Sequence, residues 1–481
     1  MNFRLLSHTM GYILWVEAGF LLLPALTACI YAETCWQQFL LTALLCAAAG
    51  TVLHLIPVKK AQMHSRDGFV AVALSWVLLS LFGALPYVFT GVLDSYIDAL
   101  FETISGLTTT GASVVTSPES MTRGGMFWRL FTHWIGGMGI LVFVLAVLPM
   151  SGNRSMHIMR AEVPGPTVGK LVPRIRKTAS ILYLLYIALT LVETVLLVAG
   201  GMSFYDALLH AFATAGTGGL STRALSIGYY NSAYIDIVVG VFMILFGANF
   251  SLYYLILLGN IRTALRNEEL RWFLGIVAAS VIAVAVNIRN MYPTVEEIIR
   301  KALFQVASII STAGFSTADF DRWPELSRSI LVCLMLIGAC AGSTGGGIKV
   351  SRLIILLKSA RCEVSRMMHP RSVNRVKLEG KTIGDEVLHN TLIFFVMYML
   401  IVAVSTLLVA TFDECDFTTN LTAVIACIGN VGPGLGKVGP MGNFSEFSAL
   451  SKIVLTLDML IGRLEIFPII MVFTPETWKK V

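Results

Sequence analysis

"TVEEIIRKALFQVASIISTAGFST" occupies residues 294–317. Two acids, Glu296 and Glu297, lie near its start, an amphipathic segment follows, and a glycine, Gly314, lies near its end. Long apolar runs lie on both sides of it, yet it is itself too short to cross the hydrocarbon of a bilayer. Acids favour a helix N-terminus, and glycine favours a helix end. The pattern predicts a re-entrant element, a short helix that enters the membrane and returns as extended chain.

The composition indicates a multi-pass membrane protein. The chain has 481 residues, of which 56% are hydrophobic and 13% charged, and its apolar runs repeatedly reach the length needed to cross a bilayer. The first run, from Tyr12 to Ile30, has few positive charges before it and no small-residue cleavage site after it. We therefore expect a retained span and not a signal peptide.

The plan of the quoted stretch occurs four times after two leading spans at about residues 11–31 and 37–57. The other short segments read "DSYIDALFETISGLTTTGASVV" from 94, "SFYDALLHAFATAGTGGLST" from 203 and "DFTTNLTAVIACIGNVGPGLG" from 416. The flanking apolar helices are expected at Phe69–Phe89 and Phe127–Leu148, Ile181–Val198 and Ile235–Leu258, Trp272–Val286 and Ile330–Leu357, and Leu392–Ala410 and Ala449–Phe473. The expected units are 1–60 for the two leading helices and 61–177, 178–270, 271–388 and 389–481 for four pore modules.

The four loop ends can be superposed on glycine. The aligned residues are Thr109, Thr110, Gly111 and Ala112; Thr217, Gly218, Gly219 and Leu220; Thr312, Ala313, Gly314 and Phe315; and Asn430, Val431, Gly432 and Pro433. Irregular backbone at membrane depth must be buried in protein or line water, so four returning loops predict a central pore. Glycine lets consecutive carbonyls face a dehydrated cation, as in a selectivity filter. Helix packing through small residues explains any one loop, but four loops in register favour the filter.

Two features predict a gate below this filter. The last helix of the third module contains "GACAGSTGGGIK", residues 338–349, and this many glycines should break the helix. Close helix packing through Gly338 and Gly342 is the alternative. A phosphate-binding loop is not indicated, because Ile348 follows the last glycine where that motif has lysine. Arg463 stands amid the final apolar run and should face the pore, or pair with Asp458 or Glu465.

These motifs resemble the Trk/Ktr/HKT superfamily of potassium transporters, and the stretches "TAGTGGLST" and "STAGFST" look like its bacterial TrkH branch. The resemblance implies an all-α fold of four helix–pore helix–filter–helix modules around a central pore, preceded by two extra helices. It implies K+ as the transported ion, bound at the sixteen filter residues, with Gly111 favouring potassium over sodium. A gating loop is implied at Gly342, Ser343, Thr344, Gly345, Gly346 and Gly347, with Arg463 approaching it across the pore.

The resemblance also implies partners. Members of this branch form homodimers on a ring of cytosolic TrkA-type subunits, which bind NAD(H) and ATP or ADP, so nucleotides are expected to act only through another chain. No nucleic-acid partner is expected. Two basic stretches, Arg154–Lys177 and Lys349–Lys381, are the expected docking surfaces, although attraction to anionic membrane lipids predicts the same charges. The implied location is the bacterial inner membrane.

The basic residues set the expected orientation. The termini and four linkers hold 24 of the 35 Lys and Arg residues, which makes their side cytoplasmic. Two acids outside the loops, Glu102 and Glu193, are further candidates. Glu102 is expected either to concentrate cations at the mouth or to serve as a cap or packing residue.

Rival functions fit less well. A K+ symporter coupled to H+ or Na+, with alternating access, would show broken helices at corresponding positions of inverted halves, whereas only one of the eight repeat helices is expected to be clearly interrupted. An enzyme would need clustered catalytic groups, and none is evident. The eight cysteines form no CxxC pair, which argues against a disulfide framework or a zinc site.

Overall fold

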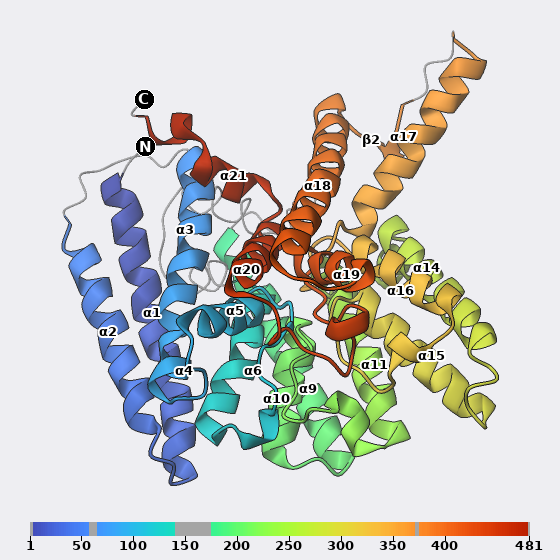
Figure 1. Ribbon diagram of the computed structural model, residues 1–481. Coiled ribbons are helices and arrows are strands. Elements are labelled where there is room, and N and C mark those ends of the chain that lie inside the picture. Colours follow the sequence, from blue (N-terminus) through green and yellow to red (C-terminus); the bar gives the residue numbers. More distant parts are fainter. Residues whose placement is uncertain (1–2, 57–64, 140–174, 371–374, 480–481) are drawn as a thin grey trace.

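The structure is a computed structural model that describes residues 3–56, 65–139, 175–370 and 375–479. Within these ranges the fold is helical apart from one small antiparallel hairpin, β1 (Lys377–Leu378) and β2 (Lys381–Thr382), as Figure 1 shows. Six of the described helices are long and apolar enough to cross a membrane, and a bent pair could make a seventh. The expected all-α membrane fold is confirmed.

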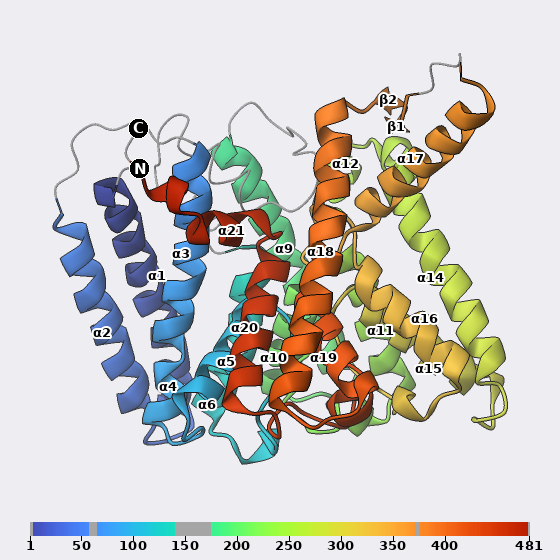
Figure 2. The ribbon, with the colours of Figure 1, turned by 45° about the horizontal axis from the view of Figure 1, so that its top comes forward.

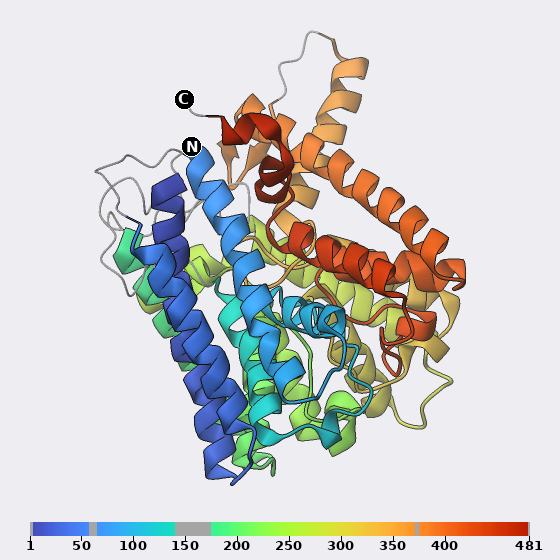
Figure 3. The same cartoon turned by 60° about the vertical axis from the view of Figure 1, so that its left-hand side comes forward.

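The leading hairpin lies at one side of the molecule (Figure 3). It consists of α1 (Phe3–Ile30) and α2 (Trp36–His54), and α1 also contacts the helices that follow it. The two helices approach closely at Gly11 and Gly50, because a Cβ atom on Gly11 would lie 2.7 Å from the Gly50 carbonyl oxygen. Small residues at such a crossing let helix backbones pack in a membrane without a hydrophobic driving force.

The four following segments share one order of elements. The first contains α3 (Ser65–Gly83), α4 (Leu85–Phe89), α5 (Tyr96–Leu107), η1 (Pro118–Ser120) and α6 (Arg123–Gly137); the second α9 (Ile175–Ala199), α10 (Phe204–Gly216), η2 (Ser226–Tyr230), α11 (Ala233–Gly247), α12 (Phe250–Leu257) and α13 (Ile261–Leu265); the third α14 (Glu268–Asn287), α15 (Val295–Ile310), η3 (Phe320–Arg322), α16 (Glu325–Ile337) and α17 (Val350–Met368); the fourth α18 (Asp385–Phe412), α19 (Phe417–Ile428), η4 (Gly436–Val438), α20 (Ala449–Arg463), α21 (Phe467–Phe473) and η5 (Pro475–Trp478).

The short helices α5, α10, α15 and α19 form the inner layer. Side-chain caps define the starts of three of them: Ser203, Thr294 and Asp416 each accept a hydrogen bond from the backbone N–H three residues later. A hydrogen bond from the Thr419 hydroxyl holds the pKa of the Asp416 carboxyl below its usual value. Each short helix packs against the last helix of the preceding segment: α10 against α6, α15 against α11, α19 against α16 and α5 against α20. The four segments therefore close into a ring.

The last helices of the segments are interrupted more often than the sequence predicts. The break after α16 was expected, but α11 and α12 also meet at 93°, and α20 ends at Arg463 before α21 begins. The prediction of a single broken helix is therefore wrong. Asn249 starts α12 with its own side chain as cap, and positive φ angles at Glu465 and Ile466 end the continuous path after α20. The end of the helix expected at Phe127–Leu148 lies outside the described residues beyond Gly139.

The ends of the described chain lie at the same end of the molecule as the β hairpin (Figure 2).

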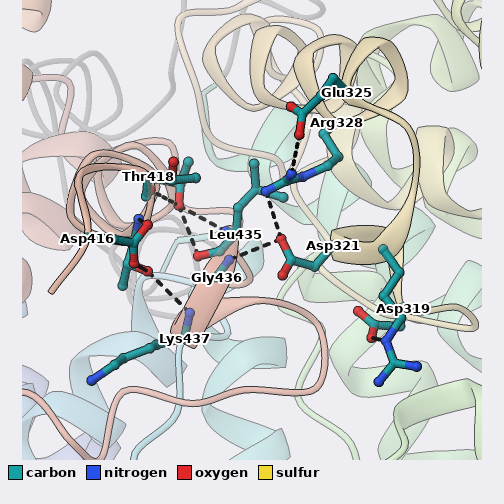
Figure 4. A network of polar contacts seen from close by, with 12 residues as sticks. Asp319, Asp321, Glu325, Arg328, Asp416, Thr418, Leu435, Gly436 and Lys437 are labelled. Carbon is teal, nitrogen blue, oxygen red and sulfur yellow. Dashed lines mark hydrogen bonds and ion pairs between the residues drawn. The ribbon is translucent and has the colours of Figure 1, made fainter.

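The loops after the third and fourth short helices are joined by a separate polar network (Figure 4). In it, the Asp321 carboxylate accepts from the Gly436 N–H at 3.1 Å and from Arg328 at 3.2 Å. This network fixes the fourth loop to the third.

Candidate ion pathway

The four return loops have the same backbone conformation. One or two residues after each short helix comes a residue in the left-handed region, Thr109, Thr217, Thr312 or Asn430, with φ between +52° and +61°. Two residues later comes a glycine with φ of +79° at Gly111, +71° at Gly219, +77° at Gly314 and +96° at Gly432. Residues with a Cβ atom rarely adopt φ values of +71° to +96°, so the backbone conformation favours glycine at these four positions. The structure thus places the four aligned tetrapeptides at equivalent positions.

These loops meet one another in a closed ring. Each glycine faces the carbonyl oxygen of the residue before the glycine of the next loop. A Cβ atom would lie 1.9 Å from the oxygen of Gly218 if added to Gly111, 1.9 Å from that of Ala313 if added to Gly219, 2.2 Å from that of Val431 if added to Gly314, and 2.7 Å from that of Thr110 if added to Gly432. No side chain fits into any of these four contacts.

A cavity of about 140 Å³ opens at the ring, and its lining includes all four central glycines. Among the described residues no group of three or more His, Cys, Asp or Glu side chains could hold a metal ion. The backbone carbonyls of the four loops are among the oxygens next to the ring. Carbonyl oxygens arranged around an axis can replace the hydration shell of a monovalent cation.

Glu102 is bonded to the first return loop through buried polar contacts. Its side chain is fully buried and pairs with Arg129 at 2.7 Å. It also accepts hydrogen bonds from the Ser113 hydroxyl and from the backbone N–H of Val114, two residues of the loop that follows Gly111. Arg129 in turn donates to the carbonyl of Ser221, beyond the second loop. Of the two alternatives for Glu102, the structure supports the packing role and not a role at the mouth. Glu193 is likewise fully buried, within α9.

The glycine-rich stretch forms a loop that packs against the third and fourth return loops. The N–H of Gly346 donates to the Thr312 hydroxyl at 2.7 Å. A Cβ atom on Gly345 would lie 2.7 Å from the Ser311 carbonyl oxygen. Gly338 and Gly342 both have positive φ and lie outside the helices, so their spacing does not serve helix packing.

The same loop lies in the bend of the second segment. Cys340 donates its N–H to the Gly247 carbonyl at 3.0 Å, and the Phe250 N–H donates to the Gly342 carbonyl at 3.0 Å. The last residue of α11 and the first of α12 are therefore both bonded to the loop. The 93° break in this helix gives the loop a place to bind.

Arg463 reaches the loop from the fourth segment. Its guanidinium donates to the carbonyl of Thr344 at 2.7 Å, and to the carbonyls of Gly136 and Gly137 at the end of α6, at 2.5 and 2.8 Å. The acids considered as its partners have other contacts. Glu465 forms an ion pair with Arg352, and Asp458 accepts from the Ser405 hydroxyl at 2.8 Å.

Comparison with known proteins agrees with this architecture. The chain matches the family described as TrkH, a cation transport protein, over residues 36–480. It belongs to the TrkH family. It is 37% identical to the Trk system potassium uptake protein TrkH of Escherichia coli K12, with all of both chains covered, and 33% identical to TrkG of the same strain, with 99% of each covered. The crystal structure of the potassium transporter TrkH from Vibrio parahaemolyticus superposes with a TM-score of 0.89, at 34% identity over the whole of both chains.

Two basic residues of this TrkH-family chain lie closer to the loop than the sequence predicts. Lys349 and Arg352 open the stretch that was expected to form a cytoplasmic docking surface, but they are 2% and 7% exposed. The Lys349 ammonium donates to the Gly345 carbonyl within the loop. These two residues therefore belong to the loop region and are not available on the surface. The other basic stretch, Arg154–Lys177, lies outside the residues whose side chains the structure describes.

The Glu102–Arg129 pair gives a test of the ring's support. Glu102→Ala would leave a buried guanidinium unpaired, and we expect it to lower the free energy of unfolding by about 3–5 kcal/mol. The control is Glu363→Ala, because that side chain is 53% exposed on α17 and its replacement should change stability by less than about 0.5 kcal/mol. Thermal unfolding in detergent, followed by tryptophan fluorescence, measures both. Equal shifts for the two variants would show that the buried pair does not support the fold.

Proposed function

We propose that this chain conducts potassium across the bacterial inner membrane through the ring of four loops. The observation that carries the proposal is the closed ring itself, in which four glycines from four equivalent segments each abut the neighbouring loop. The names of the relatives, which are potassium uptake proteins, support potassium as the ion.

Two physical effects favour a cation at the ring. Backbone carbonyl oxygens supply ligands for an ion that leaves its water behind. The C-terminal ends of α5, α10, α15 and α19 all lie next to the ring, because each helix ends within a few residues of its filter glycine. The negative ends of four helix dipoles therefore add attraction for positive charge.

The glycine-rich loop and Arg463 form the proposed gate. The loop lies directly behind the ring and is bonded to the second and fourth segments. A guanidinium beside the pathway also repels a passing cation, because charges interact strongly where water is scarce. Opening requires the loop to leave Arg463 and the bend between α11 and α12.

The remaining assignments follow the same proposal. The shared end of the chain termini and β hairpin faces the cytoplasm, as the distribution of basic residues predicts. Two copies form a homodimer, and a ring of cytosolic TrkA-type subunits carrying the nucleotide sites docks on that face beside the membrane lipids. The exposed part of α17 and the β hairpin are the candidate contact region.

A coupled symporter is the second candidate, and one observation favours it. The sequence argued against a carrier because only one helix was expected to be interrupted. The structure has further breaks between α11 and α12 and between α20 and α21, so this argument is weaker. Broken helices at corresponding positions are typical of carriers. Coupling to H+ or Na+ would make uptake depend on a second ion gradient, whereas flux through a channel would follow the electrochemical gradient of potassium alone.

Uptake of rubidium-86 into liposomes tests the main proposal. The purified chain is reconstituted, and the liposomes are loaded with potassium, sodium or an impermeant cation. We expect uptake driven by trapped potassium and not by trapped sodium, without any proton gradient. Uptake that needs an imposed proton or sodium gradient would support the symporter. If the chain alone gives no rubidium uptake, the assay is repeated with the cytosolic subunit and nucleotide.

Gly111→Ser tests the ring. The new side chain would collide with the Gly218 carbonyl, so the first loop must shift and potassium should lose its advantage over sodium. Gly91→Ser is the matched control, because Gly91 also has positive φ, at +69°, but has open space where its Cβ would be. The ratio of rubidium to sodium uptake is expected to fall at position 111 and to stay unchanged at 91. An unchanged ratio in both variants would contradict the proposed register of the first loop.

Arg463→Ala tests the gate. Removal of three donated hydrogen bonds and one charge should free the loop and raise rubidium uptake of the chain without its partner by about tenfold, the effect of one lost charge-assisted hydrogen bond. Deleting Ser343–Gly346 should raise it as well. Arg366→Ala is the control, since this arginine is on the exposed part of α17. Uptake that disappears in correctly folded Arg463→Ala protein would indicate that Arg463 has only a structural role.

A further inference from the structure

Glu269 joins the two ends of the glycine-rich loop. It lies in the first turn of α14 and is 7% exposed. One carboxylate oxygen, Oε1, accepts the backbone N–H of Ala341 at 2.7 Å and that of Ser351 at 3.1 Å. Ala341 lies just before the loop's core, and Ser351 follows it on α17. A single buried carboxylate therefore holds both sides of the loop on one helix.

The neighbouring residue, Glu268, contacts α17 and the β hairpin and not the loop. It forms an ion pair with Lys358 on α17 and accepts the backbone N–H of Glu379 in the β hairpin at 3.1 Å. Glu379 in return accepts the N–H of Glu268 at 2.6 Å and the side-chain amide of Asn267 at 2.9 Å. The start of α14 is thus bonded to the hairpin on one side and to the loop on the other.

We infer that Glu269 is a positioning residue of the gate, and that it links the position of the β hairpin to the closed conformation of the loop. The inference rests on the proposed function of the loop. Both N–H groups would lose their acceptor if the loop moved away from α14, and buried backbone donors without acceptors are costly. Displacement of the hairpin moves the first turn of α14, because Glu268 and Glu379 each accept a hydrogen bond from the backbone N–H of the other. Release of the loop then follows from the movement of Glu269.

The test compares two replacements in the full-length chain. Glu269→Ala removes the shared acceptor, and we expect rubidium-86 uptake without the partner subunit to rise by about tenfold. Glu269→Gln keeps an amide oxygen that can accept both N–H groups, so uptake should stay within about twofold of the unchanged chain. Combining Glu269→Ala with Arg463→Ala should give no more uptake than the larger single effect, because both release the same loop.

A second measurement does not depend on transport. Glu268→Ala removes contacts at a less buried position and should leave the fold intact. We expect faster hydrogen exchange at the amides of residues 338–351 in this variant, measured by mass spectrometry in detergent. Asp385→Ala, at the exposed start of α18, is the control and should leave exchange in this segment unchanged.

The outcomes separate the inference from the proposed function. If the loop deletion and Arg463→Ala raise uptake but Glu269→Ala does not, the inference is wrong and the gate stands. If none of the three raises uptake, the gate is wrong and the inference falls with it. Exchange in residues 338–351 that does not change in Glu268→Ala would also overturn the inference, even if Glu269→Ala protein fails to fold.

Discussion

The close contact of four loop backbones at the ring is the constraint on which the rest of the structure depends. At each contact a glycine lies against a neighbouring carbonyl, with no space for a Cβ atom. Loops in this conformation expose polar backbone at membrane depth, which only surrounding protein or water can compensate. The short helices, the buried Glu102–Arg129 pair and the polar network around Asp321 all hold these loops in place.

The ends of α6 and α11 supply hydrogen-bond acceptors. A helix terminus leaves carbonyl groups without partners inside the helix, and such groups need hydrogen-bond donors when they are buried. The carbonyls at the end of α6 accept from Arg463, and that of Gly247 at the end of α11 accepts from the glycine-rich loop. The break between α11 and α12 thus leaves an acceptor, the Gly247 carbonyl, that binds the loop. The interrupted helices and the proposed gate have one common physical basis.

Much of the fold could be predicted from the sequence because its signals are local. Apolar runs, capping residues and glycine clusters recur in order, and they correctly predicted the four short helices and the break after α16. Breaks in the other last helices were missed. Asn249 at the bend and the turn after Arg463 lie in strongly apolar surroundings, and hydropathy alone predicts one continuous helix there.

The sequence by itself determined the membrane class, the fourfold repeat and the alignment of the loops, since each depends on spacing and composition along the chain. Only the tertiary structure decided which polar groups meet. It placed Glu102 on Arg129, Arg463 on the ends of α6 and the loop, and Glu269 between the two sides of that loop. These contacts join residues from about 27 to more than 300 positions apart. Pairings over such distances depend on how the segments close into a ring, which no local pattern encodes.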